Sequence, residues 1–107
     1  MEGGRRVRVR YCCPICGYSN TDPRILVTHI REDHEFDKCP CCKFEGKLYQ
    51  HLSSTVLKSN DPDPCHLVLL SFISFVNTRQ RLRQRGIYVK NSKQYFDCTQ
   101  NYFQPKH

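Results

Sequence analysis

The sequence lacks tryptophan and contains a single methionine among its 107 residues. It also lacks a long apolar run. The longest, residues 67–76, is interrupted by two serines and reaches only half of the roughly 20 residues that a membrane-spanning helix needs. The N-terminus alternates arginine with valine and has no apolar segment typical of an export signal. We therefore expect a soluble, intracellular protein that does not bind membranes.

The chain also has too few hydrophobic residues, 38% in all, for each half to fold around an apolar core alone. Cysteine, in contrast, is abundant, with eight residues. In a protein without an export signal, cysteines at ligand-like spacing favour metal sites over a disulfide framework. The 17 lysines and arginines exceed the 10 acidic residues and give a net charge of +7, which favours polyanionic partners.

Four residues between positions 13 and 34 have the spacing of metal ligands. Their order is Cys-x2-Cys-x12-His-x4-His, and the candidates are Cys13, Cys16, His29 and His34. A two-residue gap lets a turn aim both thiolates at one ion, and histidines about one helical turn apart project from one helix face. Asp22 followed by Pro23 is a typical helix start, so we predict a helix that carries both histidines.

This segment resembles the Cys2His2 zinc-finger family, whose units fold as a β-hairpin and a helix around one Zn2+ ion. The resemblance covers residues 11–34 closely and residues 37–66 loosely. Tyr11, Tyr18 and Leu26 lie at the positions of the family's small core. Small, irregular proteins with tandem fingers are also similar in style to zinc-finger proteins of viral genomes, including those of archaeal viruses.

Residues 39–52 repeat the first motif in a shortened form. Cys39, Cys42 and His51 match the first three ligands, but eight residues instead of twelve separate Cys42 from His51. The next candidate ligands are Cys65 and His66, which lie beyond a loop. We predict His66 because it restores the Cys2His2 set, and Cys65 remains the alternative. The sequence therefore predicts two bound Zn2+ ions.

A zinc ion held by three protein ligands would keep an open position, as catalytic sites do. No carboxylate follows the second motif at the spacing of a hydrolase or deaminase signature. We therefore expect closed structural sites. We also expect that the protein is not an enzyme and has no small-molecule substrate. The cysteines without a predicted ligand role are either small buried hydrophobic residues or disulfide partners, which occur inside hyperthermophilic organisms. They are Cys12, Cys41, Cys98 and, if His66 is the ligand, Cys65.

The last third of the chain begins with a helical pattern of apolar residues at positions 69, 72, 73 and 76. Asp63-Pro64 predicts its start and Gly86 its end. Apolar residues surround more than one face of this helix, so it is either the central core element or a contact with a protein partner or second copy through Leu67–Val76. Aromatic and branched residues on both sides of Asn91-Ser92 predict a β-hairpin, with residues 6–11 as a third strand.

The predicted fold class is thus a small, metal-stabilised α+β protein with tandem ββα zinc fingers, followed by an amphipathic helix and a β-hairpin. We divide the chain into three parts. Residues 1–36 form the first finger with a basic N-terminal strand, residues 37–66 the shortened second finger, and residues 67–107 the C-terminal extension.

Fingers of this family most often bind double-stranded DNA through helix positions −1, 3 and 6, so the resemblance implies a DNA-binding transcriptional regulator. These positions are Asp22, Ile25 and Thr28 in the first finger, which suit bases poorly, and Phe44, Lys47 and Gln50 in the second, which suit them better. The arginines at residues 79–85 either stabilise a helix end or contact phosphates. The predicted nucleic-acid-binding residues are Arg5, Arg6, Arg8, Arg10, Arg24, Lys47, Gln50, Arg79, Arg81, Arg83 and Arg85.

Two other functions compete with DNA binding. Ile25 at a base-reading position, the acidic connector at residues 35–38 and the broad apolar helix indicate a zinc-stabilised protein-interaction module. The basic charge together with Tyr88, Tyr95 and Phe96 indicates RNA binding, because exposed aromatic rings can stack on bases.

Overall fold

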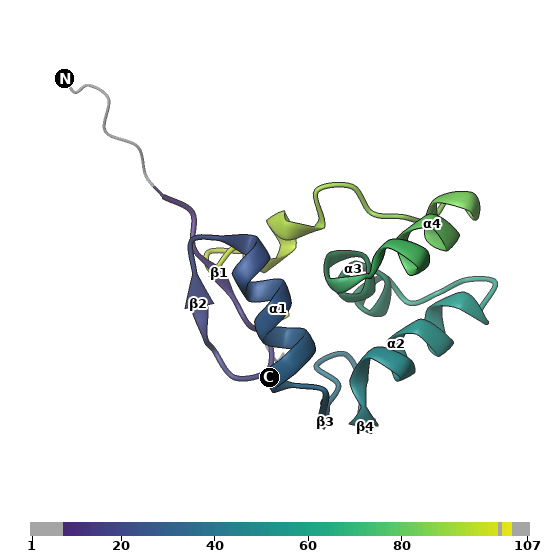
Figure 1. The fold of residues 1–107 in the computed structure, drawn as a ribbon, viewed down its shortest axis with the longest axis horizontal. Coiled ribbons are helices and arrows are strands. Elements are labelled where there is room, and N and C mark those ends of the chain that lie inside the picture. The colour runs from purple at the N-terminus through teal and green to yellow at the C-terminus, as the bar shows by residue number, and fades with distance from the viewer. Residues whose placement is uncertain (1–7, 101, 104–107) are drawn as a thin grey trace.

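The computed structural model describes residues 8–100, 102 and 103. Two hairpin–helix units follow one another, and three further helical segments complete the fold (Figure 1). No helix in the described part of the chain is long and apolar enough to cross a membrane. The elements are β1 (Tyr11–Cys12), β2 (Ser19–Asn20), α1 (Pro23–Asp33), β3 (Phe36–Lys38), β4 (Glu45–Lys47), α2 (Leu48–Leu57), α3 (Pro64–Ile73), α4 (Val76–Gln84) and the 3-10 helix η1 (Ser92–Phe96).

Each unit begins with a very short antiparallel hairpin. Tyr11 pairs with Asn20 in the first, and Phe36 pairs with Lys47 in the second. Strands of two or three residues cannot form a stable isolated hairpin, so each depends on what packs or binds against it. This confirms the predicted α+β class with two β-hairpin and helix units.

The two helices of these units begin differently. The carboxylate of Asp22 caps α1 by accepting a hydrogen bond from the Arg24 N–H at 3.0 Å, and Pro23 occupies the first turn, as predicted. In the shortened unit α2 follows β4 directly, and its N-cap residue, Lys47, has no side-chain acceptor. Instead the N–H of Leu48 donates to the carbonyl of Glu35 at 3.0 Å, so backbone from the connector replaces the missing capping segment.

Helix α3 is the central core element. It lies between α1 and α2 in Figure 1 and packs against both, and against η1. Every side chain from Val68 to Ile73 is buried within this one chain. The core interpretation of this helix is therefore confirmed for Val68–Ile73. Beyond α3, Phe75 and Val76 are 52% and 64% exposed.

The predicted single helix up to Gly86 is wrong, because the chain breaks between α3 and α4. Ser74 and Phe75 are extended, with ψ of 140° and 167°. The guanidinium of Arg31 donates to the carbonyls of Ile73 at 2.7 Å and Ser74 at 2.8 Å, and the N–H of Phe75 donates to the Tyr49 hydroxyl at 2.8 Å. Side chains from α1 and α2 thus satisfy the groups that a continuous helix would have paired internally.

The predicted β-hairpin around Asn91-Ser92 is also wrong. Asn91 adopts a left-handed conformation with φ of 55°, and residues 92–96 then form η1. Phe96 is only 2% exposed and stacks on Phe72 of α3, with ring centroids 4.0 Å apart. Burial of this ring outweighs local strand propensity. Strand-like pairing remains only at Tyr11, which bridges to Asp97, so the two ends of the described chain do meet.

Two disulfides join the hairpin–helix units to the C-terminal half. Cys12 is bonded to Cys98 and Cys41 to Cys65, with Cα separations of 5.2 and 5.8 Å. Of the two roles open to these cysteines, the structure assigns the disulfide. They close loops of 86 and 24 residues, and in the chain-entropy model each contributes roughly 3 to 4.5 kcal/mol of stability.

Candidate metal centres

The first candidate centre joins the hairpin and helix of the first unit. Its ligand atoms all lie within 4.8 Å of one another, and Cys16 Sγ is 3.3 Å from His29 Nε2. The cysteines lie on the turn after β1, where Gly17 adopts a φ of +83° that favours glycine. His29 lies within α1 and His34 is its C-cap residue. The predicted set Cys13, Cys16, His29 and His34 is thus brought together.

The second centre draws its ligands from three elements. Cys39, Cys42, His51 and His66 have their ligand atoms within 4.8 Å of one another, and Cys42 Sγ is 3.4 Å from His51 Nε2. His66 lies in the first turn of α3, whereas Cys65 points its sulfur into the disulfide with Cys41. The geometry therefore selects His66 over Cys65 as the fourth ligand.

Each histidine of the two centres has a hydrogen-bond partner for its Nδ1 atom. Asp33 and Asp37 lie 2.9 and 2.6 Å from the Nδ1 atoms of His29 and His34. In the second centre Asp63 lies 3.0 Å from His66 and Thr55 lies 3.5 Å from His51. These contacts fix the ring orientation and leave Nε2 as the ligand atom, which is the usual arrangement around protein-bound zinc. These partners were not predicted from the sequence, although each lies three or four residues from its histidine.

Two buried histidine nitrogens in the described part of the chain lack a hydrogen-bond partner, and a bound metal ion would supply one bond to each. Within the described residues, His34 Nε2 and His66 Nε2 are buried without a hydrogen-bond partner. A tetrahedral zinc ion with bonds of about 2.0 Å to nitrogen and 2.3 Å to sulfur separates its ligand atoms by roughly 3.3 to 3.8 Å, which matches the two sulfur–nitrogen distances above. Two thiols and two imidazoles are also a preferred zinc donor set. Both clusters could therefore hold a metal ion.

The thiols of the two centres differ in acidity. Burial raises the pKa of Cys13 and of Cys39 to about 11. Desolvation opposes ionisation of Cys16 too, but hydrogen bonds from the Tyr18 N–H and the histidines of its centre outweigh it and lower the pKa to about 7. In the metal-free chain the buried thiols are therefore protonated at neutral pH, and binding of a divalent cation would release these protons.

An aromatic ring covers the first histidine of each centre. Tyr18 stacks on His29 with centroids 4.3 Å apart, and Phe44 stacks on His51 with centroids 3.9 Å apart. Both aromatic residues come two positions after the second cysteine of their unit. The two centres are therefore built on the same plan despite the shortened loop.

No protein-family model, curated protein or solved structure matches this chain. The likeness of the two ββα-like units to zinc fingers is thus one of ligand type, ligand order and geometry.

Several of the predicted nucleic-acid-binding arginines have structural partners. Arg85 donates to the carbonyls of Val56 and Leu57 in the last turn of α2 and of Ser59 beyond it, and Arg79 donates to the carbonyl of Ser74 at 3.3 Å. Arg85 thus bonds the C-terminal end of α2, and Arg79 bonds the C-cap residue of α3. Arg10 is bound to Ser19, Arg24 to Asp22, and Arg83 lies over the Tyr88 ring at 4.9 Å, while Arg8 is exposed and Arg5 and Arg6 lie outside the described residues.

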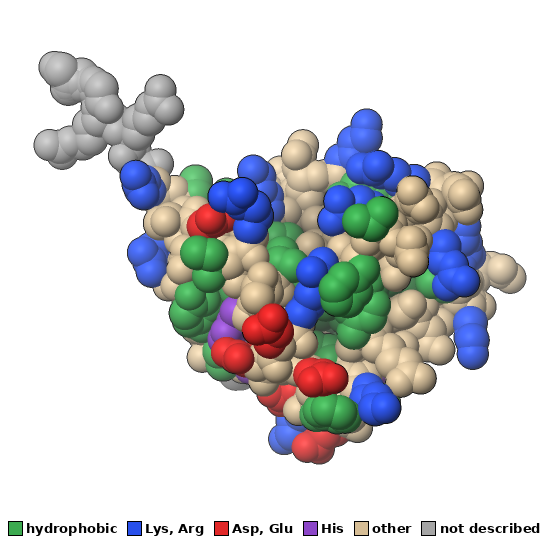
Figure 2. All heavy atoms as spheres, viewed as in Figure 1, with side chains coloured by type: hydrophobic (Ala, Val, Ile, Leu, Met, Phe, Trp, Pro, Cys, Tyr) green, Lys and Arg blue, Asp and Glu red, His purple; other side chains and the backbone are tan. Residues whose placement is uncertain are grey.

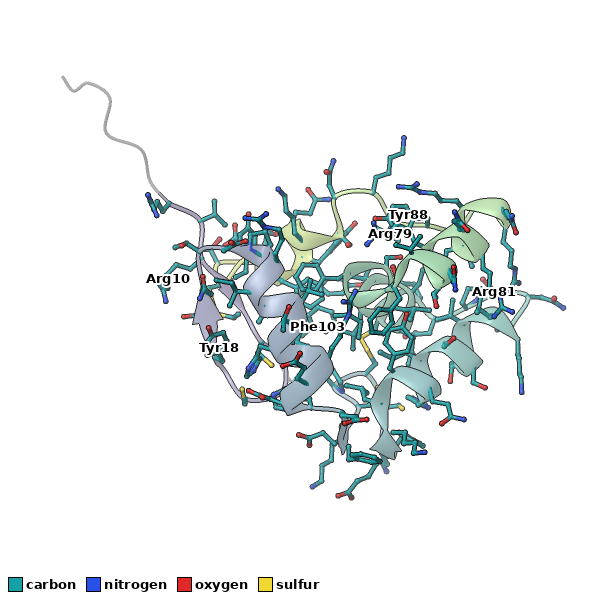
Figure 3. All side chains as sticks on the ribbon, viewed as in Figure 1. Arg10, Tyr18, Arg79, Arg81, Tyr88 and Phe103 are labelled. Carbon is teal, nitrogen blue, oxygen red and sulfur yellow. A yellow bond between two sulfur atoms is a disulfide. The ribbon has the colours of Figure 1, made fainter. Side chains whose placement is uncertain are left out.

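The remaining three predicted residues come together. Lys47, Gln50 and Arg81 line one groove of about 580 Å³ between α2 and α4. Figure 3 places Arg81 between α4 and the last turns of α2. Ser53, Ser54 and Lys58 complete the polar lining of this α2–α4 groove. Of the aromatic residues that favoured RNA, Phe96 is buried, Arg83 lies over the Tyr88 ring, and Tyr95 is partly exposed.

Proposed function

We propose that this chain is a zinc-stabilised protein that binds double-stranded DNA through the α2–α4 groove and acts as a transcriptional regulator. One observation carries the proposal. Lys47 at the end of β4, Gln50 of α2 and Arg81 of α4 line a single groove. Of the described residues that line it, three are cationic, Lys47, Lys58 and Arg81, and one, Glu35, is acidic. A groove of this charge attracts a phosphate backbone.

The lining residues differ in chemistry and would therefore contact different parts of the DNA. Lys47 can donate to guanine and Gln50 can bond adenine in both directions, so these two would contact base edges. Arg81 and Lys58 lie farther along the groove and would contact phosphates, together with the hydroxyls of Ser53 and Ser54. With only two base-reading side chains, sequence specificity would be modest.

The metal centres would serve this function by holding the helices in place. A bound Zn2+ supplies folding free energy by linking ligands that are distant in the chain. The second ligand set joins the hairpin, α2 and α3, which carries α4 after it, and so fixes the two walls of the groove. We further propose that neither centre is catalytic, since four protein ligands complete a tetrahedral shell.

We also propose that the two units belong to the Cys2His2 zinc-finger type, in an irregular form similar to the small tandem-finger proteins of viral genomes. The order of hairpin, two cysteines, helix and two histidines supports this for the first unit. The second unit departs from it because its last ligand comes from a separate helix.

A salt titration tests the proposal with the zinc-loaded full chain and duplex DNA of random sequence. Affinity should fall steeply between about 50 and 200 mM salt, and Lys58→Ala or Arg81→Ala should each reduce the slope of log affinity against log salt by about one. Arg24→Ala is the control, because Arg24 is bound to Asp22 on α1. A flat salt response, or no binding at low salt, would remove the proposal.

A further inference from the structure

The outer face of α1 is the counterpart of the α2–α4 groove in the first unit. It forms an open hollow of about 620 Å³. Asp22, Ile25 and Thr28, which correspond to the base-reading positions of a finger, all line it. We call it the α1 hollow. Its volume is slightly larger than that of the α2–α4 groove.

The α1 hollow carries charge opposite to that of the α2–α4 groove. Three carboxylates, from Asp22, Glu32 and Asp33, belong to the described residues that line it, against one guanidinium, from Arg24. That guanidinium is paired with Asp22 at 3.2 Å, but its side chain is 90% exposed, so this surface pair is weak and a basic group of a partner can share the Asp22 carboxylate. Figure 2 shows acidic side chains over α1, while lysine and arginine side chains gather around α4 and the end of α2. A phosphate backbone approaching α1 would meet charge of its own sign.

Apolar side chains lie among these carboxylates. Ile25 is 46% exposed, and Tyr18, whose ring stacks on His29, is 38% exposed. Ile25 extends from the exposed face of α1 between the acidic residues of the two helix ends. Covering the apolar centre of such a surface lowers the free energy only if the covering group also pairs with the surrounding carboxylates.

We propose that the α1 hollow docks a cationic amphipathic segment of a partner protein. An apolar side chain of the segment packs against Ile25 and Tyr18, and lysines or arginines on either side pair with Asp22 and with Glu32. Glu32 follows the N-cap residue Asp22 by ten positions along α1, a rise of about 15 Å, so the basic groups of the partner lie about 15 Å apart. The chain would thus hold nucleic acid on one unit and protein on the other, but the docking does not depend on DNA binding.

The test is a selection from a displayed library of random 16-residue peptides against the zinc-loaded full chain. Enriched peptides should contain basic residues on both sides of an apolar residue. Their affinity should fall on the order of tenfold with Ile25→Asp and with Glu32→Lys. Lys47→Glu, on the corresponding face of α2, is the matched control and should leave peptide affinity unchanged. Zinc content and circular dichroism of each variant must equal those of the parent chain.

A charge exchange separates a specific contact from general attraction. Peptides with their lysines replaced by glutamate should not bind the parent chain at the α1 hollow but should regain affinity for Glu32→Lys. The proposal is overturned if selected peptides lack basic residues, if neither α1 substitution weakens them, or if none is enriched. Self-association in sedimentation experiments that Glu32→Lys abolishes would identify a second copy as the occupant and also overturn it.

Discussion

The rings of His51 and His66 lie edge to face, with centroids 5.4 Å apart and planes at 71°. His29 and His34 have the same relation, with centroids 4.9 Å apart and planes at 82°. The first pair is separated by fourteen residues of the chain and the second by four. The second centre therefore repeats the ligand geometry of the first by recruiting its last histidine from α3, and in doing so it becomes a tertiary link between α2 and the core helix.

Replacing this recruited ligand should remove one metal ion. In His66→Ala we expect zinc affinity of the second centre to fall more than about 100-fold, because the remaining three ligands leave the shell open. Native mass spectrometry should then show one bound zinc in place of two. Cys65→Ser is the neighbouring control and should retain two. Two tightly bound ions in His66→Ala would show that His66 is not a ligand.

The carboxylates that contact the histidine Nδ1 atoms should change the zinc affinity without changing the number of bound zinc ions. Asp63→Asn keeps a good helix-capping residue for α3 but weakens the acceptor for His66 Nδ1–H. We expect zinc affinity of the second centre to fall about 10- to 100-fold, measured by competition with a chromophoric chelator. Asp61→Asn, two residues earlier in the exposed loop, should have no effect. Equal affinities in the two variants would contradict the role of Asp63.

Chelation should unfold the two hairpin–helix units even with both disulfides intact. The strands are too short to persist alone, and a metal ion bound by the thiolates of Cys13 and Cys39 would link each hairpin to its helix. We expect loss of the native circular dichroism and of cooperative melting after removal of metal, with recovery on addition of Zn2+. A metal-free chain with an unchanged melting transition would contradict both candidate centres.

The two disulfides should differ in their effect on the second centre. Cys41 and Cys65 each neighbour one of its ligands, so Cys41→Ser/Cys65→Ser should lower zinc affinity there on the order of tenfold as well as destabilise the fold. Cys12→Ser/Cys98→Ser should destabilise by a similar amount, roughly 3 to 4.5 kcal/mol in denaturant unfolding, and leave that affinity unchanged. Identical zinc affinities in both double variants would show that the shorter disulfide does not position His66.

Two arginines of α4 should separate stability from DNA binding. Arg85→Ala removes hydrogen bonds to carbonyls at the end of α2 and should destabilise the chain by about 1 to 2 kcal/mol, without changing the salt slope for DNA. Arg81→Ala should have the opposite pattern, because Arg81 lines the α2–α4 groove. Denaturant unfolding and salt titration of both variants give the comparison. A reduced salt slope in Arg85→Ala alone would place the DNA contact elsewhere on α4.

Local patterns predicted the parts of this molecule that local chemistry determines. The spacing of Cys13, Cys16 and His29 on a turn and a capped helix follows from backbone geometry, and the structure agrees. The prediction of His66 depended only on the fact that it completes a Cys2His2 donor set, because the spacing of the ligands did not exclude Cys65. The structure decides it because the Cys41–Cys65 disulfide occupies that sulfur.

The features that were not predicted depend on contacts between distant residues. The chain breaks after Ile73 because Arg31 of α1 and Tyr49 of α2 bond the backbone at the end of α3. No helix-breaking residue at this point of the sequence predicts the break. The predicted hairpin at residues 87–98 does not form, because Phe96 packs on Phe72 of α3. Disulfide pairing cannot be read from cysteine spacing alone. The carboxylates of Asp33, Asp37 and Asp63 could have been found, because their offsets from the histidines suit a helix or turn.

The bond between Cys12 and Cys98 makes a closed covalent ring of most of the polypeptide. A protease that hydrolyses one peptide bond inside this ring, at any loop, releases no fragment, and the nicked molecule keeps its apparent mass on a gel until a reductant is added. Surface loops could therefore be cut once while both units stay tethered to the same molecule.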